Sequence, residues 1–181
     1  MFLFTIGTLP LSTEAAVVVL NDLNIKSHWD SSFDSGLIIK HLDSYTTITY
    51  AQYKGIFPTK PRDLLYRSHI HYLQDPTTLS IDENSDILAT SFSIVSDSNN
   101  NNIIPEKSTH IRSELIYAGM YLQSIREDPL SCRVTYLVAN NPKGSLPSFA
   151  VSVAASKAPL VIASLRKFIK QNHVHSQGKE H

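Results

Sequence analysis

Residues 144–171, GSLPSFAVSVAASKAPLVIASLRKFIKQ, decide the fold class, because small and apolar residues continue through them without the alternation of a strand. Basic residues lie near the end, where cations interact favourably with a helix dipole: Arg166, Lys167 and Lys170. Pro147 suits a first turn, whereas Pro159 lies inside the pattern and should kink the helix or leave one carbonyl unpaired. We therefore predict a long C-terminal helix from Pro147 to about Lys170.

Strand-like stretches fill most of the chain before this helix. They are rich in β-branched and aromatic residues and are bounded by turn residues: 2–7, 36–43, 45–54, 62–74, 87–96, 109–125 and 131–141. Capping residues and an early glutamate predict a helix over 11–22, and 25–36 is typical of a polar turn region. Because a sheet of this size needs an apolar partner, we predict an α+β fold, with a curved antiparallel β-sheet wrapped around the C-terminal helix.

Composition indicates one soluble domain with a sizeable core. The 181 residues are 42% hydrophobic and 18% charged, and 16 basic residues balance 16 acidic ones, so no net charge draws the chain to nucleic acid. Residues 1–20 have no basic segment before their apolar run, unlike a signal peptide. The single Cys132 excludes an internal disulfide and fits a reducing compartment, so we expect a cytoplasmic monomer without a nucleic-acid partner.

Four motifs follow one another along the chain: LNDLNIKSHWDSSF (20–33), KPRDLLYR (60–67), IPEKSTHIRSELIYAG (104–119) and TYLVANNPKGSLPSF (135–149). In this order they resemble the motifs of START domains, the lipid-transfer domains related to the steroidogenic acute regulatory protein. The first is similar to the family's helix and Trp-Asp segment, and the second to its Pro-Arg-Asp strand. The third resembles its Val-Arg-Ala-Glu segment, and the fourth its Asp-Pro-Lys-Gly-Ser-Leu-Pro signature. The resemblance covers about residues 14 to 170.

The resemblance implies a helix-grip fold, in which an incomplete antiparallel barrel and the C-terminal helix enclose a hydrophobic tunnel for one lipid. Family members bind sterols, phospholipids, ceramide or other hydrophobic ligands, and many move them between membranes. We expect a START-like domain over 1–172, starting at what is the family's third strand, and a disordered tail at 173–181. Two other functions stay open: a lipid-sensing regulatory module without transfer, and a cyclase- or hydratase-like enzyme of the same fold.

Strand alternation places Arg62, Leu64, Tyr66 and Ser68 on one face, which we predict to face the tunnel. The guanidinium of Arg62 can donate hydrogen bonds to a phosphate or hydroxyl headgroup, and pairing with a carboxylate is the structural alternative. Further residues are predicted to contact the lipid: Arg112, Tyr136, Asn140, Phe149, Val153 and Leu160. Their structural alternatives are an ion pair of Arg112 with Glu114, a core tyrosine, a turn-capping asparagine and ordinary helix packing.

The stretch KGIFPTKPRD (54–63) connects two predicted strands through apolar residues, where a polar turn would suffice. We predict that this loop and the segment 142–147 lie at the tunnel mouth, contact a membrane and part from the helix to admit lipid. The predicted contact and gating residues are Ile56, Phe57, Pro58, Gly144, Leu146 and Pro147. The alternative for Phe57 is packing on the C-terminal helix.

The remaining motifs do not predict catalysis or metal binding. His69 and His71 share a strand face, and His173 and His175 lie close together, but no third ligand clusters with either pair in the sequence. The sequence contains no Gly-x-Ser-x-Gly, P-loop or Gly-x-Gly-x-x-Gly motif. We therefore expect a lipid-binding protein without enzyme activity, cofactor or metal, whose contact with membranes is peripheral and transient.

Overall fold

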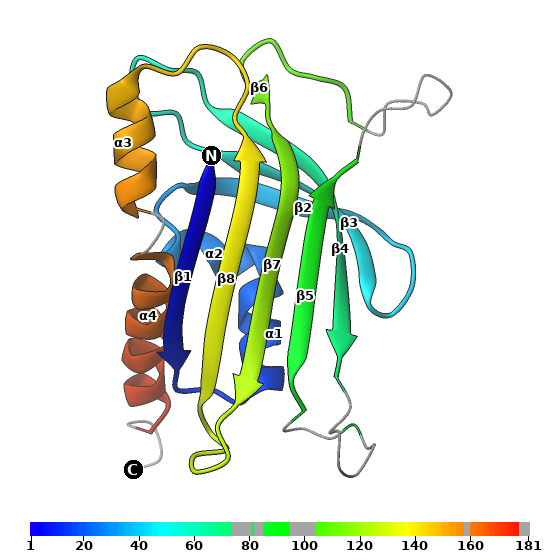
Figure 1. Cartoon of the computed structure of the whole chain (residues 1–181), viewed down its shortest axis with the longest axis vertical. Helices are drawn as coiled ribbons and strands as arrows, with labels where there is room; N and C mark the ends of the chain where they lie inside the picture. Colours follow the sequence, from blue (N-terminus) through cyan, green and yellow to red (C-terminus); the bar gives the residue numbers. More distant parts are fainter. Residues whose placement is uncertain (74–80, 82–84, 95–103, 158–159, 178–181) are drawn as a thin grey trace.

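The computed structural model of the chain describes residues 1–73, 81, 85–94, 104–157 and 160–177. Within these residues the fold is an eight-stranded sheet with helices along one side (Figure 1). The strands are β1 (Phe2–Leu9), β2 (Phe33–His41), β3 (Thr46–Tyr53), β4 (Arg62–Tyr72), β5 (Ile87–Ser93), β6 (Ile111–Arg112), β7 (Glu114–Ser124) and β8 (Cys132–Asn141). The helices are α1 (Thr13–Asn21), α2 (Leu23–Trp29), α3 (Ser148–Lys157) and α4 (Leu160–Gln177).

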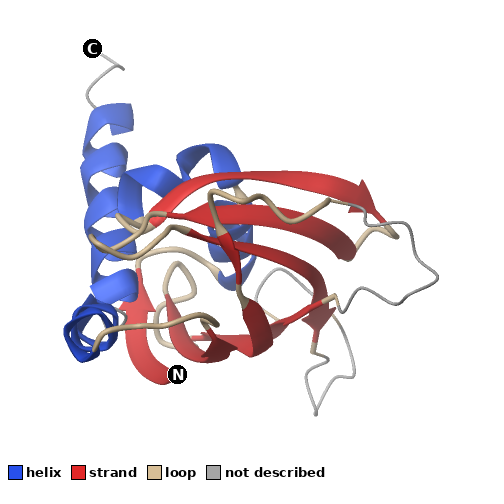
Figure 2. Cartoon of the chain, turned by 90° about the horizontal axis from the view of Figure 1, so that it is seen from above, coloured by secondary structure: helices blue, strands red, loops and turns tan. Residues whose placement is uncertain are grey.

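The sheet has the strand order β1-β8-β7-β5-β4-β3-β2, and neighbours along this path are antiparallel. The short β6 pairs in parallel with the start of β4. Seen from above, the strands curve around an interior, and the helices lie at one side of it (Figure 2). These features confirm the predicted α+β helix-grip architecture with its curved antiparallel sheet.

Two regions differ from the elements predicted for them. The stretch 109–125, predicted as one strand, is divided into β6 and β7 at Ser113, whose N–H donates to the Asp63 carbonyl and whose hydroxyl donates to the Pro142 carbonyl. Residues from the predicted polar turn region form α2. The Asp22 carboxylate starts this helix, because it accepts a hydrogen bond from the N–H of Asn24 and caps the free backbone donors.

The predicted C-terminal helix consists of α3 and α4, and residues 158–159 between them lie outside the described residues, as does the kink predicted at Pro159. The backbone of α4 continues to Gln177, past the predicted boundary at residue 172, and residues 178–181 also lie outside the described part. No single helix in the described ranges is long and apolar enough to cross a membrane. The pair Ser148–Lys157 and Leu160–Asn172 reaches that length and composition only together, bent by 42°.

The largest hydrophobic core lies where α1, α2 and α4 pack against the sheet. Its members include Leu9, Trp29, Leu122, Val134 and Leu165. The absence of a side chain at Gly7 lets α4 approach β1 closely, because a Cβ there would lie 2.6 Å from Cγ2 of Ile162. The Cys132 thiol is buried in this core, and burial raises its pKa to about 11, so it stays protonated at neutral pH.

Candidate functional site

A cavity of about 940 Å³, partly open to the surroundings, lies between the sheet and the helices. Apolar side chains from β1, β4, β7, β8 and α4 form much of its wall: Leu3, Leu64, Ile70, Leu115, Val138 and Val161. This volume is at the upper end of the range for small-molecule sites in proteins, which are mostly apolar with a few placed polar groups. The cavity is therefore large enough for a hydrophobic ligand.

Strand β4 contributes one face to this cavity, as its alternation predicts. The wall includes Arg62, Leu64, Tyr66 and Ser68. Ser68 uses its hydroxyl in a 2.8 Å hydrogen bond to the hydroxyl of Ser91 on β5, so this part of the wall is polar but internally satisfied. The first half of β4, which contains Arg62 and Tyr66, therefore offers more polar groups to a ligand than the part around Ser68.

Arg62 has no carboxylate partner within the described residues. Its Nη1 donates to the carbonyl of Lys60, while Nε and Nη2 are buried and have no hydrogen-bond partner in that part of the chain. Burial lowers the pKa of this guanidinium, but an arginine still carries its charge at neutral pH. The ion pair with a carboxylate, which was the structural alternative for Arg62, is therefore not formed among the described residues. Two of its donor atoms remain available to a ligand headgroup.

Three tyrosines, Tyr53, Tyr66 and Tyr136, line the same cavity as Arg62 and are called the tyrosine cluster below. Burial raises the pKa of Tyr66 and Tyr136 to about 12, and burial and the neighbouring tyrosines raise that of Tyr53 well above its usual value. All three hydroxyls are therefore neutral donors at physiological pH. Sequence reasoning missed Tyr53, although β3 places it directly opposite Arg62 and cross-strand partners share a face.

Asn140 lies at the end of β8 that adjoins the N-terminus. Its backbone carbonyl accepts a 2.6 Å hydrogen bond from the amino group of Met1. The side chain lines the cavity, and its Oδ1 is buried without a partner in the described ranges. The structure thus brings the predicted residues Arg62, Tyr66, Tyr136 and Asn140 to the wall of one cavity.

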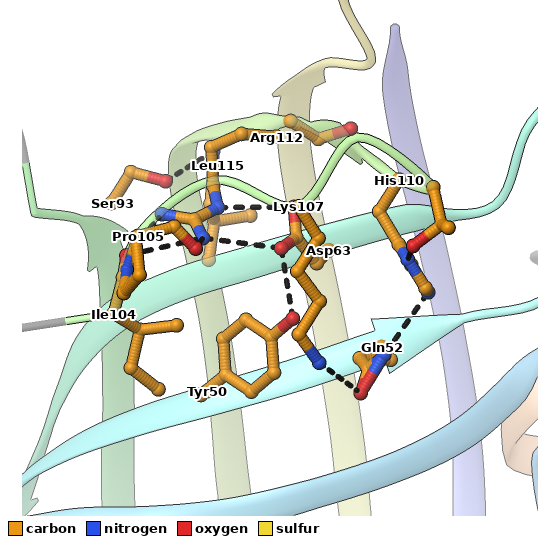
Figure 3. A network of polar contacts seen from close by, with 12 residues as sticks. Tyr50, Gln52, Asp63, Ser93, Ile104, Pro105, Lys107, His110, Arg112 and Leu115 are labelled. Carbon is orange, nitrogen blue, oxygen red and sulfur yellow. Dashed lines mark hydrogen bonds and ion pairs between the residues drawn. The ribbon is translucent and has the colours of Figure 1, made fainter.

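Arg112 is the predicted ligand contact that the structure places elsewhere. Its Nε and Nη2 bind the two oxygens of Asp63 at 3.0 and 3.1 Å, and Tyr50 donates its hydroxyl to the same carboxylate at 2.9 Å (Figure 3). Asp63 alternates with Arg62 along β4 and therefore faces away from the cavity. Glu114 is not its partner either, since it lies 3.9 Å from Lys143. Contrary to the prediction, Arg112 is not part of the cavity wall, and its ion pair with Asp63 joins β6 to β4.

The C-terminal helices turn a different face to the cavity from the predicted one. Leu160 lines it, but Phe149 and Val153 do not, and Phe149 is half exposed. The wall residues of α3 are instead Ala150, Val151, Ala154 and Lys157. A helix turns through about 100° per residue, so an error of one position moves the predicted stripe out of the cavity. The predictions for Phe149 and Val153 are corrected accordingly.

The loop between β3 and β4 places Ile56 at the cavity wall and leaves Phe57 90% exposed. Phe57 therefore does not pack on the C-terminal helix. The following residue, Pro58, is exposed and preceded by a cis peptide bond. The tip of this loop thus presents an apolar side chain to the surroundings, directly beside the residue that reaches the cavity.

The second predicted gating segment also adjoins the cavity. Leu146 lines it, whereas Gly144 and Pro147 lie beside the wall without contributing to it. Gly144 has a φ of +67°, and a Cβ there would lie 2.9 Å from Cδ1 of Ile111. Glycine is favoured at this position, because other residues rarely adopt the conformation and a side chain there would push against the end of Ile111.

Apart from Arg62, the charged wall residues were not found by sequence reasoning. The described wall contains Lys26, Lys54, Arg62 and Lys157, with Asp30 as its only carboxylate. Burial lowers the pKa of Lys26, and Asp30 opposes this shift. The Lys26 ammonium also lies 5.3 Å from the ring centroid of Trp29. Lys26 lies on α2, and Asp30 follows its last residue. These side chains reach the cavity only because of the way α2 packs on the sheet, which local sequence pattern does not predict.

Metal coordination has no candidate among the described residues, since no three His, Cys, Asp or Glu side chains gather there. The rings of His69 and His71 do lie close, with centroids 4.1 Å apart and planes tilted by 59°, but Nδ1 of His69 is hydrogen-bonded to the hydroxyl of Thr46. This pair packs on the surface of β4 opposite the cavity.

The family model for the START domain matches residues 4–174. Among curated proteins, human ceramide transfer protein is 23% identical over 155 residues, covering 83% of this chain and 24% of that protein. Mouse acetyl-coenzyme A thioesterase is 29% identical over 156 residues, covering 84% of this chain and 25% of that protein. The chain thus spans about a quarter of the length of these curated relatives.

Solved structures share the fold. Human STARD10 superposes with a TM-score of 0.77 and 22% identity, over 98% of this chain and 66% of that one. Human StAR-related lipid transfer protein 5 superposes with a TM-score of 0.75 and 15% identity, over 93% of this chain and 74% of that one.

Proposed function

Because the chain belongs to the START domain family, we propose that it binds a single lipid in its internal cavity and moves it between membranes. The observation that carries the proposal is the cavity of about 940 Å³, whose wall is largely apolar and includes a few polar groups such as Arg62 and Asn140. Moving a lipid through water requires covering its apolar surface, which is worth about 25 cal/mol for each Å². Related proteins named for ceramide and lipid transfer support the same function.

Lipid entry in this proposal takes place at the end of the cavity bounded by the loop 54–61, the segment 142–147 and α3. Ile56, Leu146 and Ala150 line the cavity from these three parts. The exposed Phe57 inserts into a membrane surface, and the loop and the segment then part from the helix. Membrane contact is peripheral and transient. A cytoplasmic location accompanies the proposal and accords with the free, buried Cys132 thiol.

Lipids that co-purify with the protein test this function. Organic extraction of the folded protein, followed by mass spectrometry, should recover one phospholipid, sterol or ceramide-like lipid per chain. Transfer of labelled lipid between donor and acceptor vesicles should then increase with protein concentration. A folded protein that stays empty after incubation with vesicles, and that transfers no lipid, would contradict the proposal. Retention without transfer would assign the chain a lipid-sensing role instead.

We propose that this activity involves no catalysis. The similarity to an acetyl-coenzyme A thioesterase covers a quarter of that protein. Among the wall residues that the structure describes, no serine hydroxyl is hydrogen-bonded to a histidine, an arrangement that would activate a nucleophile. Incubation with acetyl-coenzyme A should release no free thiol above the buffer rate, and sustained release would refute this part of the proposal.

A further inference from the structure

The cavity wall has more basic than acidic side chains, although the whole chain has no formal net charge. The sequence has equal numbers of basic and acidic residues, whereas the described wall has four Lys or Arg side chains and one carboxylate. That carboxylate, Asp30, interacts with Lys26 and accepts hydrogen bonds from the N–H and hydroxyl of Ser32. Arg62 is therefore left without a counter-charge.

The free donors of Arg62 form one edge of its guanidinium. With Nη1 occupied by the Lys60 carbonyl, Nε and Nη2 remain, and both are buried without a partner in the described part of the chain. These two N–H groups are parallel, which is the geometry that binds two oxygens of one carboxylate or phosphate. Charged groups withdrawn from water in proteins are usually paired, so this edge of the guanidinium is suited to an anionic group of a ligand.

The tyrosine cluster adds neutral donors to the same cavity wall. Tyr53 lies opposite Arg62 in the β3–β4 register, and Tyr66 lies on the same face of β4. Burial keeps the hydroxyls of Tyr66 and Tyr136 protonated at neutral pH, so they can donate hydrogen bonds to a ligand. The group that these side chains would bind is therefore rich in acceptors and poor in donors.

We propose that the lipid taken up by this cavity carries an anionic oxygen group, a phosphate or a carboxylate, bound by the Nε–Nη2 edge of Arg62 and the hydroxyls of the tyrosine cluster. This inference rests on the proposed lipid-binding function and names the headgroup chemistry for it. A neutral hydroxyl headgroup could accept the same hydrogen bonds, but it would leave the charge of Arg62 uncompensated. An anionic group satisfies both the donors and the charge.

Lipid pairs that differ in one group test the proposal. Delipidated protein is titrated with phosphatidic acid and with diacylglycerol of the same acyl chains, and with a fatty acid and the corresponding fatty alcohol. We expect at least one acidic member to bind about tenfold more tightly than its neutral counterpart, because charge-assisted bidentate hydrogen bonds form only with the acid. Inorganic phosphate alone should bind far more weakly, since it lacks the apolar part of the ligand.

Variants on the two faces of β4 assign the effect to Arg62. R62Q should lose the preference for the acidic lipid while it still binds the neutral one. R62K, which keeps the charge and loses the planar edge, should weaken the preference and guards against a failure of R62Q to fold. Arg67 is exposed on the other face of the same strand, so R67Q should keep the full preference. Thermal unfolding of each variant checks that it is folded.

Four results would overturn the inference. Equal affinity for both members of each pair would refute an anionic headgroup while leaving lipid binding intact. An undiminished preference in R62Q and R62K would place the anion site elsewhere. Tight binding of inorganic phosphate that is independent of any lipid would make Arg62 an ion site. Failure to bind any of the four lipids would also refute the inference, and the analysis of co-purified lipid would then decide separately whether the cavity holds a lipid of another class.

Discussion

Asp63 accepts three hydrogen bonds while its side chain is almost completely buried, one from Tyr50 and two from Arg112. Replacing it by asparagine leaves the Arg112 guanidinium without a counter-charge. We predict that D63N lowers the free energy of unfolding by about 3 kcal/mol or more, as breaking a buried ion pair does. Urea unfolding followed by circular dichroism measures this loss.

The pair between Lys143 and Glu114 provides the matched control. Its charged atoms are 3.9 Å apart and both side chains are about half exposed. E114Q should therefore change the free energy of unfolding by less than about 1 kcal/mol, the usual worth of a surface pair. Equal effects of the two substitutions would show that Asp63 does not join β4 to β6 as the structure indicates.

The tyrosine cluster makes stability depend on alkaline pH. Burial raises the pKa of Tyr66 and Tyr136 to about 12, whereas tyrosine in an unfolded chain ionises near pH 10. Below about pH 10 these tyrosines are protonated in both the folded and the unfolded chain, so their contribution to the free energy of unfolding is fully present. Above it the unfolded chain loses protons that the folded chain retains, so the free energy of unfolding falls by up to about 1.4 kcal/mol per pH unit for each tyrosine.

We predict that unfolding sets in between about pH 10 and pH 12, together with the ionisation of these tyrosines. Circular dichroism reports the unfolding and phenolate absorbance reports the ionisation. Y66F should make the loss of stability with pH less steep. Full ionisation of all tyrosines near pH 10 in a protein that stays folded would contradict the raised pKa values.

At the residue scale, local pattern predicted positions on strands better than positions that depend on packing. Alternation along β4 is a property of extended backbone, so Arg62, Leu64, Tyr66 and Ser68 could be assigned to one face. Lys26 reaches the cavity only through the way α2 packs beneath the sheet. Arg112 was misplaced because its partner Asp63 is distant in sequence and meets it only through the β4–β6 pair.

At the scale of elements, the loop between β3 and β4 directs two adjacent apolar side chains differently, one to the cavity and one to the surroundings. Ile56 reaches the cavity wall, and Phe57 points away with 90% of its surface exposed. We predict that F57A weakens binding to vesicles about tenfold, because inserting a phenylalanine into a membrane is worth about 1.5–3 kcal/mol. Its free energy of unfolding should change by less than about 0.5 kcal/mol, since the side chain has little contact to lose. Vesicle flotation and urea unfolding measure the two effects.

Leu130 is the control for Phe57. It is 78% exposed in the loop between β7 and β8, at the opposite end of the sheet from the loop 54–61 (Figure 1). L130A removes a similar apolar side chain and should leave vesicle binding unchanged. If both substitutions weaken binding equally, the membrane does not contact the protein at the loop 54–61.

The helices show where element-scale prediction fails. The change of period at residue 144 was enough to predict a C-terminal helix, and α3 and α4 fill that region. Which face of α3 meets the cavity depends on its rotation, and its apolar residues are spread nearly all round. The stripe through Ala150 and Ala154 could not be distinguished in the sequence from the stripe through Phe149 and Val153.

At the scale of the whole molecule, the order of four motifs was sufficient to predict the architecture, because each motif belongs to a definite strand or helix. The pairing of β1 with β8 joins residues far apart in the sequence, and local pattern could not predict it. The size of the cavity could not be predicted, since it is the space that packing leaves unfilled.

Filling that space tests the central claim, which is that the cavity holds one lipid. Ala118 lines the cavity on β7, and Ile116 is 59% exposed on the same strand. A118W places an indole in the cavity, whereas I116W places one on the surface. Native mass spectrometry after incubation with vesicles counts the lipid bound to each folded variant. The account predicts one lipid per chain for the unmodified protein and for I116W, and occupancy reduced about tenfold, or roughly 1.4 kcal/mol, for A118W. Equal lipid occupancy in all three proteins would contradict it.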